Sequence, residues 1–533
     1  MKRISTLFTL CFFILFSQDT PSENYLKMRQ GFTYFGHVYQ KVTDNFVEEI
    51  DPLVLIKSGI RGMLSDLDPY TEFFDETNSR RLDLITTGKY GGIGIEIAQR
   101  TNGVMVVNVV ENSPAYREKI KSGDFITHID EKYVLDKNLD EVSHLLKGHI
   151  GEKLTLKLKN SISNKERTIL LAREEIKLYD IPYFGFLNNE TPYIKLSGFS
   201  ENAPTEMLNA LTTLKTNRPE MNQLILDLRN NPGGLLESAR QIVNLFVPRG
   251  ELILTTYGKR EGYHRIYATD IPKFPNLQLI VLINKYSASA SEIVAGALQD
   301  LDRAIVLGEE SYGKGLVQKI FTIDPNLNIK VKITTAKYFT PSGRSIQKYN
   351  VLKKENTEKN ISFYTRNGRK VKSGCGISPD VHFDMKEKSP ILKQLIREHY
   401  ILDYSLNHVA NNKNQSISFK DFVSFLKEKN FSYAPEGVSK LNEFLDIADK
   451  RQYPEEIQSI ISNTITQLNN SFEYLIYTHQ KEISNEIEKC CAKLTQGVKG
   501  EFIVRLQNDP VVEKASELLE NSDMFYGILI AHQ

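Results

Sequence analysis

The sequence predicts a multidomain α/β protein with a helical region at each end. With 533 residues the chain is too long for one ordinary hydrophobic core, so several domains are expected. Between about residues 193 and 381, apolar strand-like runs alternate with helical patterns, which indicates a largely parallel sheet with both faces covered. Apolar residues recur at helical spacing before residue 74 and again after residue 385.

The overall composition is that of a soluble globular protein, with 41% hydrophobic and 25% charged residues. The net charge is +1, so the charge balance does not indicate a nucleic-acid partner. The chain has 4 cysteines, and their spacing matches neither a disulfide framework nor a metal site. We therefore expect neither a metal ion nor an organic cofactor.

The N-terminus has the order of a secretory signal peptide, which we assign to residues 1–17. Lys2 and Arg3 precede a mostly apolar run at residues 7–16, and polar residues follow from Ser17. The run is short for a membrane span, and the cleavage site itself is poor. We expect export to the periplasm or cell envelope, with the N-terminus either cleaved or kept as a membrane anchor.

Two different patterns follow before the α/β region. Residues 20–80 are expected to form a helical N-terminal region, in which Phe32 and Phe35 fall at helical spacing. Residues 81–176 are expected to form a compact β-rich domain. Within it, residues 93–97 alternate in polarity with the period of a half-buried strand.

Residues 177–385 are expected to form the α/β core, and residues 386–533 a helical C-terminal extension. Strands of the buried type recur in the core at residues 224–228, 279–283 and 305–307. The extension is rich in amphipathic helical pattern. It could mediate dimerisation, hold a partner or form the wall of a cage, or it could be a solvated appendage without a function of its own.

The strongest chemical feature lies where the apolar strand 279–283 turns into a helix. Ser289 lies in this turn. A serine there can act as a nucleophile, because free N–H groups at a helix start can hold an anion. Ser289 and Glu292 also match the capping box of a helix N-terminus, and the segment taken alone favours this interpretation.

A second feature is Lys314, which lies between two glycines shortly after the strand 305–307. A lysine acts as a general base only when neutral, and burial in an apolar site favours the neutral form. Two parallel strands of one sheet could bring Lys314 beside Ser289. No histidine lies in a triad-like motif, so serine and lysine are the natural pair.

A third feature is the glycine-rich turn Asp227-Leu228-Arg229-Asn230-Asn231-Pro232-Gly233-Gly234. The backbone N–H groups of such a turn can bind phosphate or line an oxyanion hole. The sequence matches neither a P-loop nor the dinucleotide-binding fingerprint. Taken alone, it indicates only a tight turn.

Together these segments resemble the C-terminal processing (tail-specific) serine peptidases. The resemblance extends over about residues 25–381 and keeps the order and spacing of that family's motifs. It implies a crotonase- or ClpP-like α/β peptidase core. The matching segments are residues 227–234, 287–300, 303–308, 313–318, 335–347 and 376–380.

The resemblance also implies roles for individual residues. Ser289 matches the nucleophile, Lys314 the general base, and Gln318 the residue that orients the lysine. Because Gln318 follows Lys314 by four positions, a helical turn or a bent strand must bring the two together. The implied oxyanion donors are the N–H of Ala290 and that of either Gly233 or Gly234.

The β-rich domain at residues 81–176 resembles the PDZ domain that these peptidases carry. The residues matching its carboxylate-binding loop are Gly91, Gly92, Ile93 and Gly94. Successive backbone N–H groups can hold a terminal carboxylate while the peptide adds to a sheet edge. The expected partners are polypeptides with apolar C-termini, and a homo-oligomer through the N- or C-terminal helices and an adaptor protein are left open.

The sequence therefore predicts an exported serine endopeptidase that recognises polypeptide tails and cuts with a Ser–Lys dyad. One alternative is a tail-binding scaffold without proteolytic activity, against which the presence of Ser289, Lys314 and Gln318 argues. A second is a crotonase-like acyl-CoA enzyme, against which the PDZ-like domain argues. The physiological substrate and the oligomeric state are left open.

Overall fold

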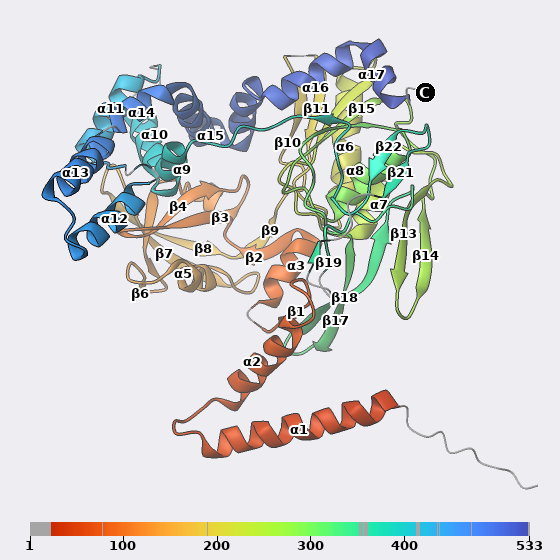
Figure 1. Ribbon diagram of the computed structural model, residues 1–533, viewed down its shortest axis with the longest axis horizontal. Coiled ribbons are helices and arrows are strands. Elements are labelled where there is room, and N and C mark those ends of the chain that lie inside the picture. The colour runs from red at the N-terminus through yellow and green to blue at the C-terminus, as the bar shows by residue number, and fades with distance from the viewer. Residues whose placement is uncertain are drawn as a thin grey trace, which may run out of the picture. The chain divides into compact units, whose positions relative to one another are not determined.

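The fold is described from a computed structural model, which covers residues 23–530 apart from short gaps (Figure 1). The expected signal peptide at residues 1–17 lies outside the described residues. The chain divides into two compact units, residues 1–73 and residues 74–533. The gaps are residues 77, 189, 351–354, 357–360, 412–415, 434, 436 and 471.

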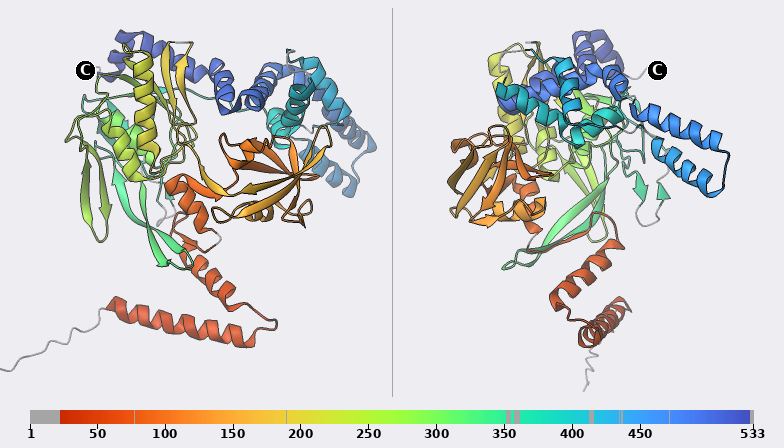
Figure 2. Two further views of the ribbon diagram at one scale, coloured as in Figure 1. Left: turned by 180° about the vertical axis from the view of Figure 1, so that it is seen from behind. Right: turned by 90° about the vertical axis from the view of Figure 1, so that its left-hand side faces the viewer.

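In its described part, residues 23–73, the first unit contains two helices, which are red in Figures 1 and 2. They are α1 (Glu23–Asn45) and α2 (Pro52–Ser65). The Asp51 side chain caps α2 by accepting from the Leu53 N–H at 2.8 Å, and Pro52 occupies the first helical position. Within residues 23–530, as far as they are described, no helix is both long and apolar enough to cross a membrane.

The second unit begins with the β-rich domain, orange in Figure 2. Its sheet has the order β3-β4-β5-β7-β8 and is antiparallel throughout, so β3 is an edge strand. Buried Val104, Ile126 and Leu156 form part of its core. The strands and helices are β3 (Ile95–Arg100), β4 (Gly103–Val109), α4 (Pro114–Arg117), β5 (Asp124–Ile129), β6 (Lys132–Tyr133), α5 (Leu139–Leu146), β7 (Lys153–Asn160) and β8 (Glu166–Ala172).

A two-stranded ladder of β2 (Lys89–Gly92) and β9 (Glu174–Lys177) accompanies this domain. Helix α3 (Ser79–Thr87) precedes β2 and ends at Gly88 in the left-handed conformation, with φ 70°. The short strand β1 (Glu72–Phe74) lies at the boundary of the two units in the sequence.

The α/β core is a six-stranded sheet of order β10-β11-β12-β15-β16-β23. Strand β10 is antiparallel to β11, and every other neighbouring pair is parallel. This arrangement confirms the predicted parallel sheet. The strands are β10 (Tyr183–Leu187), β11 (Thr191–Lys195), β12 (Gln223–Asp227), β15 (Gln278–Ile283), β16 (Ile305–Gly308) and β23 (Val381–His382).

Successive residues of the central strands pack on opposite faces of the sheet. On one face Leu279 and Val281 pack with α6 (Ala203–Asn217), α7 (Leu236–Asn244) and α8 (Ala290–Asp300). On the other face Ile280 and Leu282 pack with residues of α16 (Pro510–Glu520) and α17 (Ser522–Leu529). The last two helices therefore cover one face of the α/β core, beside the strands in Figure 1.

A second, antiparallel sheet contains two long hairpins. One is β13 (Leu252–Gly258) with β14 (Gly262–Tyr267), and the other is β17 (Leu316–Asp324) with β18 (Ile329–Phe339). Strands β13 and β18 join the hairpins. Short strands follow: β19 (Tyr349–Asn350), β20 (Glu355–Asn356), β21 (Ser362–Tyr364) and β22 (Lys370–Lys372).

Most of the remaining helices form a bundle with its own core, in which Phe422, Leu426 and Ile483 are buried, whereas α12 and α13 contribute none of their described residues to this core and pack against each other. This agrees with the predicted helical C-terminal region. The helices are α9 (Pro390–Arg397), α10 (Tyr400–Asn411), α11 (Phe419–Glu428), α12 (Val438–Lys450), α13 (Glu455–Asn470), α14 (Phe472–Thr478) and α15 (Gln480–Gln507).

Candidate active site

Three turns meet at the carboxyl edge of the parallel sheet. They are residues 228–234 after β12, residues 284–289 after β15, and residues 309–315 after β16. These strands are neighbours in the order β12-β15-β16, so the turns that follow them lie side by side. Open α/β sheets generally bind their ligands at this edge.

Ser289 lies at the junction between the turn after β15 and helix α8. Its backbone has φ 55° and ψ −111°, a conformation that is costly for a residue with a side chain. The surrounding hydrogen bonds hold it there, because its N–H donates to Glu292 Oε2 at 2.8 Å and its carbonyl accepts from the Tyr338 hydroxyl at 3.2 Å. The side chain is half-buried at the start of the helix.

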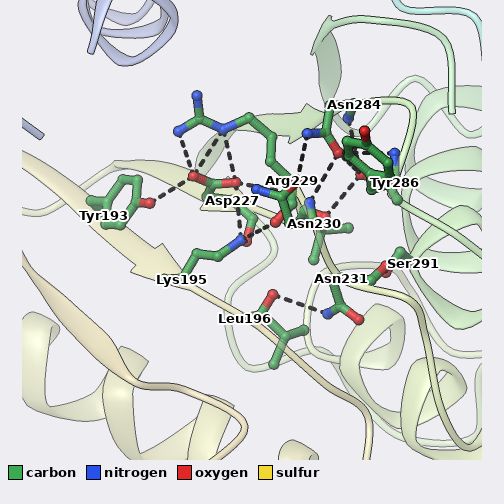
Figure 3. A network of polar contacts seen from close by, with 12 residues as sticks. Tyr193, Lys195, Leu196, Asp227, Arg229, Asn230, Asn231, Asn284, Tyr286 and Ser291 are labelled. Carbon is green, nitrogen blue, oxygen red and sulfur yellow. Dashed lines mark hydrogen bonds and ion pairs between the residues drawn. The ribbon is translucent and has the colours of Figure 1, made fainter. Parts of the chain in front are cut away.

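The turn after β12 packs directly against the Ser289 turn. The Asn231 carbonyl accepts from the Ala288 N–H at 3.0 Å and from the Ser291 hydroxyl at 2.9 Å. Asn231 in turn is fixed by its own side chain, whose amide donates to the Leu196 carbonyl at 2.9 Å (Figure 3). Asn284 and Asn230 add two more bonds between the turns, at 2.9 and 3.0 Å.

Of the two glycines predicted near the oxyanion, Gly233 makes the close approach. A methyl group on Gly233 would lie 2.7 Å from the Ala288 carbonyl oxygen and 2.9 Å from the Ala290 nitrogen, and φ is 101°. Only glycine fits there. The Gly233 N–H donates to Asn231 Oδ1 at 2.9 Å. A methyl group on Gly234 would instead meet the Phe199 carbonyl oxygen at 2.5 Å.

Lys314 lies in the turn after β16, with its side chain half-buried. This turn contacts the Ser289 turn through the Tyr312 N–H, which donates to the Ser287 carbonyl at 2.9 Å. Gly313 has φ 88°, and a methyl group on it would lie only 2.5 Å from Lys348 Cβ. The turn therefore requires glycine at this position. The structure thus places the segments of Ser289 and Lys314 against each other.

Glu292 contacts both the Ser289 segment and the Lys314 segment, whereas its sequence pattern indicated only a cap of one helix. Its side chain is fully buried in the first turn of α8. Oε1 accepts from the Ser311 hydroxyl at 2.5 Å and the Gly313 N–H at 2.7 Å, while Oε2 accepts from the Ser289 and Lys314 N–H groups at 2.8 and 2.9 Å. One carboxylate therefore fixes both backbone segments.

Burial raises the pKa of Glu292, and the donated hydrogen bonds from Ser311 and from the backbone oppose this effect. One signal in the sequence points to this residue, namely its capping-box spacing from Ser289. That spacing concerns a single helix and contains nothing about the donors at 311–314. The interpretation of Glu292 as a cap partner was therefore incomplete.

Gln318 lies on β17, where the pairing with β18 shifts register between Val317 and Gln318. Such a bulge bends a strand and redirects its side chains. The Gln318 amide donates to the Thr334 hydroxyl at 3.3 Å. The sequence requires either a helical turn or a bent strand between Lys314 and Gln318. The structure has a strand with a bulge there.

A buried polar network anchors the beginning of the turn after β12 (Figure 3). Asp227 Oδ2 accepts from the Tyr193 hydroxyl at 2.7 Å and from the Arg229 guanidinium at 2.6 Å. Lys195 donates to Asp227 Oδ1 at 3.4 Å and to the Arg229 carbonyl. Burial alone would raise the pKa of Asp227, but the charges of Arg229 and Lys195 outweigh it and hold the pKa well below its usual range.

The predicted tail-binding loop lies beside the edge strand β3. Gly91 and Gly92 pair with β9, and Ile93 is buried in the core of the domain. Gly94 has φ 80°, and a methyl group there would lie 2.2 Å from Ser113 Cβ. The loop leads into β3, which is an edge strand of the sheet and is contacted by helix α5. An extended peptide that adds to a sheet needs such an edge strand.

Among the residues that the structure describes, no group of three or more His, Cys, Asp or Glu side chains could hold a metal ion.

Comparison with known proteins agrees with this architecture. Residues 91–171 match the PDZ domain model, residues 190–356 match peptidase family S41, and residues 391–519 match the model "Probable PDZ-protease, C-terminal helical domain". The carboxy-terminal-processing protease of Bartonella bacilliformis is 33% identical over 346 residues, which is 64% of this chain and 79% of that protein. The chain belongs to peptidase family S41.

This S41 peptidase is a C-terminal processing serine peptidase with a PDZ domain. A probable CtpA-like serine protease of Staphylococcus aureus strain COL is 26% identical over 521 residues, or 97% of this chain and 90% of that protein. Among solved structures, the photosystem II D1 C-terminal processing protease is 26% identical, with a TM-score of 0.37, over 68% of this chain and 87% of that chain.

Proposed function

We propose that this S41 peptidase is a serine endopeptidase in which Ser289 is the nucleophile and Lys314 the general base. The observation that carries the proposal is the buried carboxylate of Glu292, which accepts from the backbone N–H of both Ser289 and Lys314. It holds the two segments together without using either reactive side chain. A nucleophile and its base need such fixed proximity.

The reaction is acyl transfer. Neutral Lys314 takes the proton of the Ser289 hydroxyl as the oxygen attacks the scissile carbonyl. The protonated lysine then gives this proton to the departing amine, which leaves an acyl-enzyme on Ser289. Water hydrolyses the ester with Lys314 again acting as base. Gln318, which follows the bulge in β17, is proposed to orient the Lys314 side chain.

The oxyanion is proposed to bind the N–H of Ala290 and a second N–H from the turn after β12. The Gly233 N–H already donates to Asn231, which favours the Gly234 N–H as the second donor. The close approach of Gly233 to Ala290 supports an oxyanion hole between these two turns. Each donor in such a hole typically contributes about 3 kcal/mol.

The PDZ domain is proposed to select the substrate by its tail. The N–H groups of residues 91–94 bind the terminal carboxylate, and the tail adds to the edge strand β3 as an extra strand. Ile95 of β3 and Leu139 and Leu145 of α5 are half-buried, and their two elements are in contact, so we propose that they receive an apolar last side chain. The substrates are therefore proposed to be polypeptides with apolar C-termini.

We also propose export to the periplasm or cell envelope, on the basis of the signal-like order of residues 1–17. The N-terminal and C-terminal helices are the surfaces proposed for a homo-oligomer or an adaptor protein. Exposed Phe32, Phe35 and Val38 on α1 support the N-terminal surface, because apolar side chains in such a stripe favour protein contact.

The test uses the purified protein and an unfolded polypeptide that ends in an apolar tail. We expect the parent to cut it, and Ser289→Ala and Lys314→Ala to remain folded but inactive. Lys319→Ala is the matched control, because this lysine is exposed on the same strand as Gln318 and forms a surface ion pair with Glu261. A substrate with a charged tail should be cut more slowly by the parent.

Two outcomes would contradict the proposal. If Lys314→Ala cuts at the parent rate, the lysine is not the base. If the parent binds the tail but does not cut in any arm, the tail-binding scaffold is the better description of the protein.

A further inference from the structure

Arg229, in the turn after β12, binds two carboxylates that come from distant parts of the chain. Its guanidinium donates to Asp227 and also forms a bidentate pair with Asp509, at 3.1 Å from Nη1 and 2.8 Å from Nη2. Asp509 belongs to the C-terminal helical region, 280 positions away. Both side chains of this second pair are largely buried, with 7% and 12% exposed.

The pair completes the charge balance of the buried network. Lys195 and Arg229 supply two positive charges, and Asp227 and Asp509 supply two negative charges. Without Asp509 the network would hold one uncompensated cation away from water. Breaking a buried pair in this way is strongly destabilising, so the structure would favour any rearrangement that brings the Arg229 guanidinium to water.

Arg229 also determines the path of the turn. Its N–H donates to Asp227 Oδ1 at 2.8 Å, and its carbonyl accepts from Lys195. The next residue, Asn230, has φ 59° and bonds to Asn284 of the Ser289 turn. A movement of Arg229 toward solvent would therefore reach the oxyanion segment four residues later.

Asp509 is itself held rigidly. Its Oδ1 caps helix α16 by accepting from the Val511 and Val512 N–H groups at 3.0 and 3.3 Å. Val511, Val512 and Leu519 of this helix are buried against the sheet. The helix therefore presents Asp509 to Arg229 from a fixed position.

We propose that Asp509 is a positioning residue for the oxyanion turn, so that the C-terminal helical region takes part in shaping the active site through its contact with Arg229. This inference rests on the proposed function of the turn. In addition to capping α16, Asp509 would then hold the turn after β12 in place through Arg229.

The experiment compares Asp509→Ser and Asp509→Asn in the full chain. Serine keeps the helix cap but cannot reach Arg229, and asparagine keeps the shape but removes the charge. The matched control is Asp51→Ser. Like Asp509, Asp51 is followed by a proline at the start of a helix, and its carboxylate accepts from the backbone N–H groups two and three positions later. Cutting of the apolar-tailed polypeptide, binding of a peptide boronate and amide exchange of residues 227–234 are measured.

We expect Asp509→Ser to lower kcat on the order of tenfold, with KM within about twofold, and to weaken boronate binding by a similar factor. This is less than the 10²–10³-fold loss typical of deleting an oxyanion donor, because the donors stay in place but are less well held. Exchange of residues 227–234 should become faster. Asp509→Asn should fall between the parent and Asp509→Ser, and Asp51→Ser should match the parent.

Parent kcat and parent exchange in both Asp509 variants would overturn the inference. An equal loss in Asp51→Ser would also overturn it, because the effect would then be that of any helix cap. If Asp509→Ser does not fold, the isosteric Asn variant decides. An inactive parent would count against the proposed function alone, and the exchange measurement would still decide whether Asp509 holds the turn.

Discussion

Replacing Glu292 by glutamine would separate its two roles, as a helix cap and as the link between the Ser289 and Lys314 segments. The carboxylate accepts four hydrogen bonds, three of them from backbone N–H groups. A glutamine has one acceptor oxygen, so two of the four donors would face its NH₂ group. Hydrogen bonds to a charged group contribute about 1.5–3 kcal/mol each.

Two lost bonds would therefore cost roughly 3–6 kcal/mol. A neutral amide avoids part of the desolvation cost that raises the pKa of Glu292. We therefore expect the free energy of unfolding to fall by about 2–4 kcal/mol. The free energy of unfolding in urea measures this loss. Because the donors belong to both the Ser289 and the Lys314 segment, which carry the proposed nucleophile and base, kcat should also fall at least about tenfold.

The control for this prediction is Glu141→Gln. Glu141 occupies the same capping-box position in α5, where its side chain accepts from the Asn138 N–H at 3.0 Å at an exposed site. A glutamine can still accept this one hydrogen bond, because a capping box uses either Glu or Gln at this position, so Glu141→Gln should lose little stability. If Glu292→Gln loses no more stability than Glu141→Gln and cuts at the parent rate, Glu292 is only a cap and the reasoning is refuted.

Three further predictions concern the turn after β12 and the helices that cover the sheet. Gly233→Ala should abolish cutting, because the added methyl group would lie 2.7 Å from the Ala288 carbonyl oxygen and φ is 101°. The activity of the folded variant is measured, and a variant as active as the parent would contradict the close approach of the two turns. Arg229 and Lys195 hold the pKa of Asp227 below 3.8, so its stabilising effect is complete above that value and is lost as pH falls through the lower folded-state pKa. The difference in urea midpoint between the parent and Asp227→Asn should therefore be constant from about pH 7 to about pH 5 and shrink below about pH 4, and a constant gap would be evidence against the charge network. Deletion of residues 509–533 should leave an insoluble or molten core, measured by near-UV circular dichroism, because it exposes the second face of the sheet.

Much of the site followed from the sequence because parallel strands impose its geometry. The apolar runs at 224–228, 279–283 and 305–307 predicted strands of a largely parallel sheet, and the structure shows these three strands as neighbours whose turns meet at one edge. The sequence placed Ser289 and Lys314 in turns after two of these strands, and the strand order of the structure makes those turns adjacent.

The parts that the sequence did not predict all depend on contacts between distant segments. Glu292 has a local pattern that a helix cap explains fully, while its other donors lie 19 to 22 positions further along the chain. The partner of Arg229 lies 280 positions away, and no local pattern indicates it. Similarly, the amphipathic pattern of α16 predicted a buried face but not the sheet that buries it.

The covering of the sheet by α16 and α17 has a consequence for the timing of activity. A ribosome makes the Ser289 and Lys314 segments long before residues 509–529, and during this interval one face of the sheet lacks its cover and Arg229 lacks its second carboxylate. We expect the nascent chain to be unable to cut until these helices have been synthesised and have docked. A peptidase whose site is completed last would in this way be prevented from attacking its own chain, or its neighbours, while that chain is still being made.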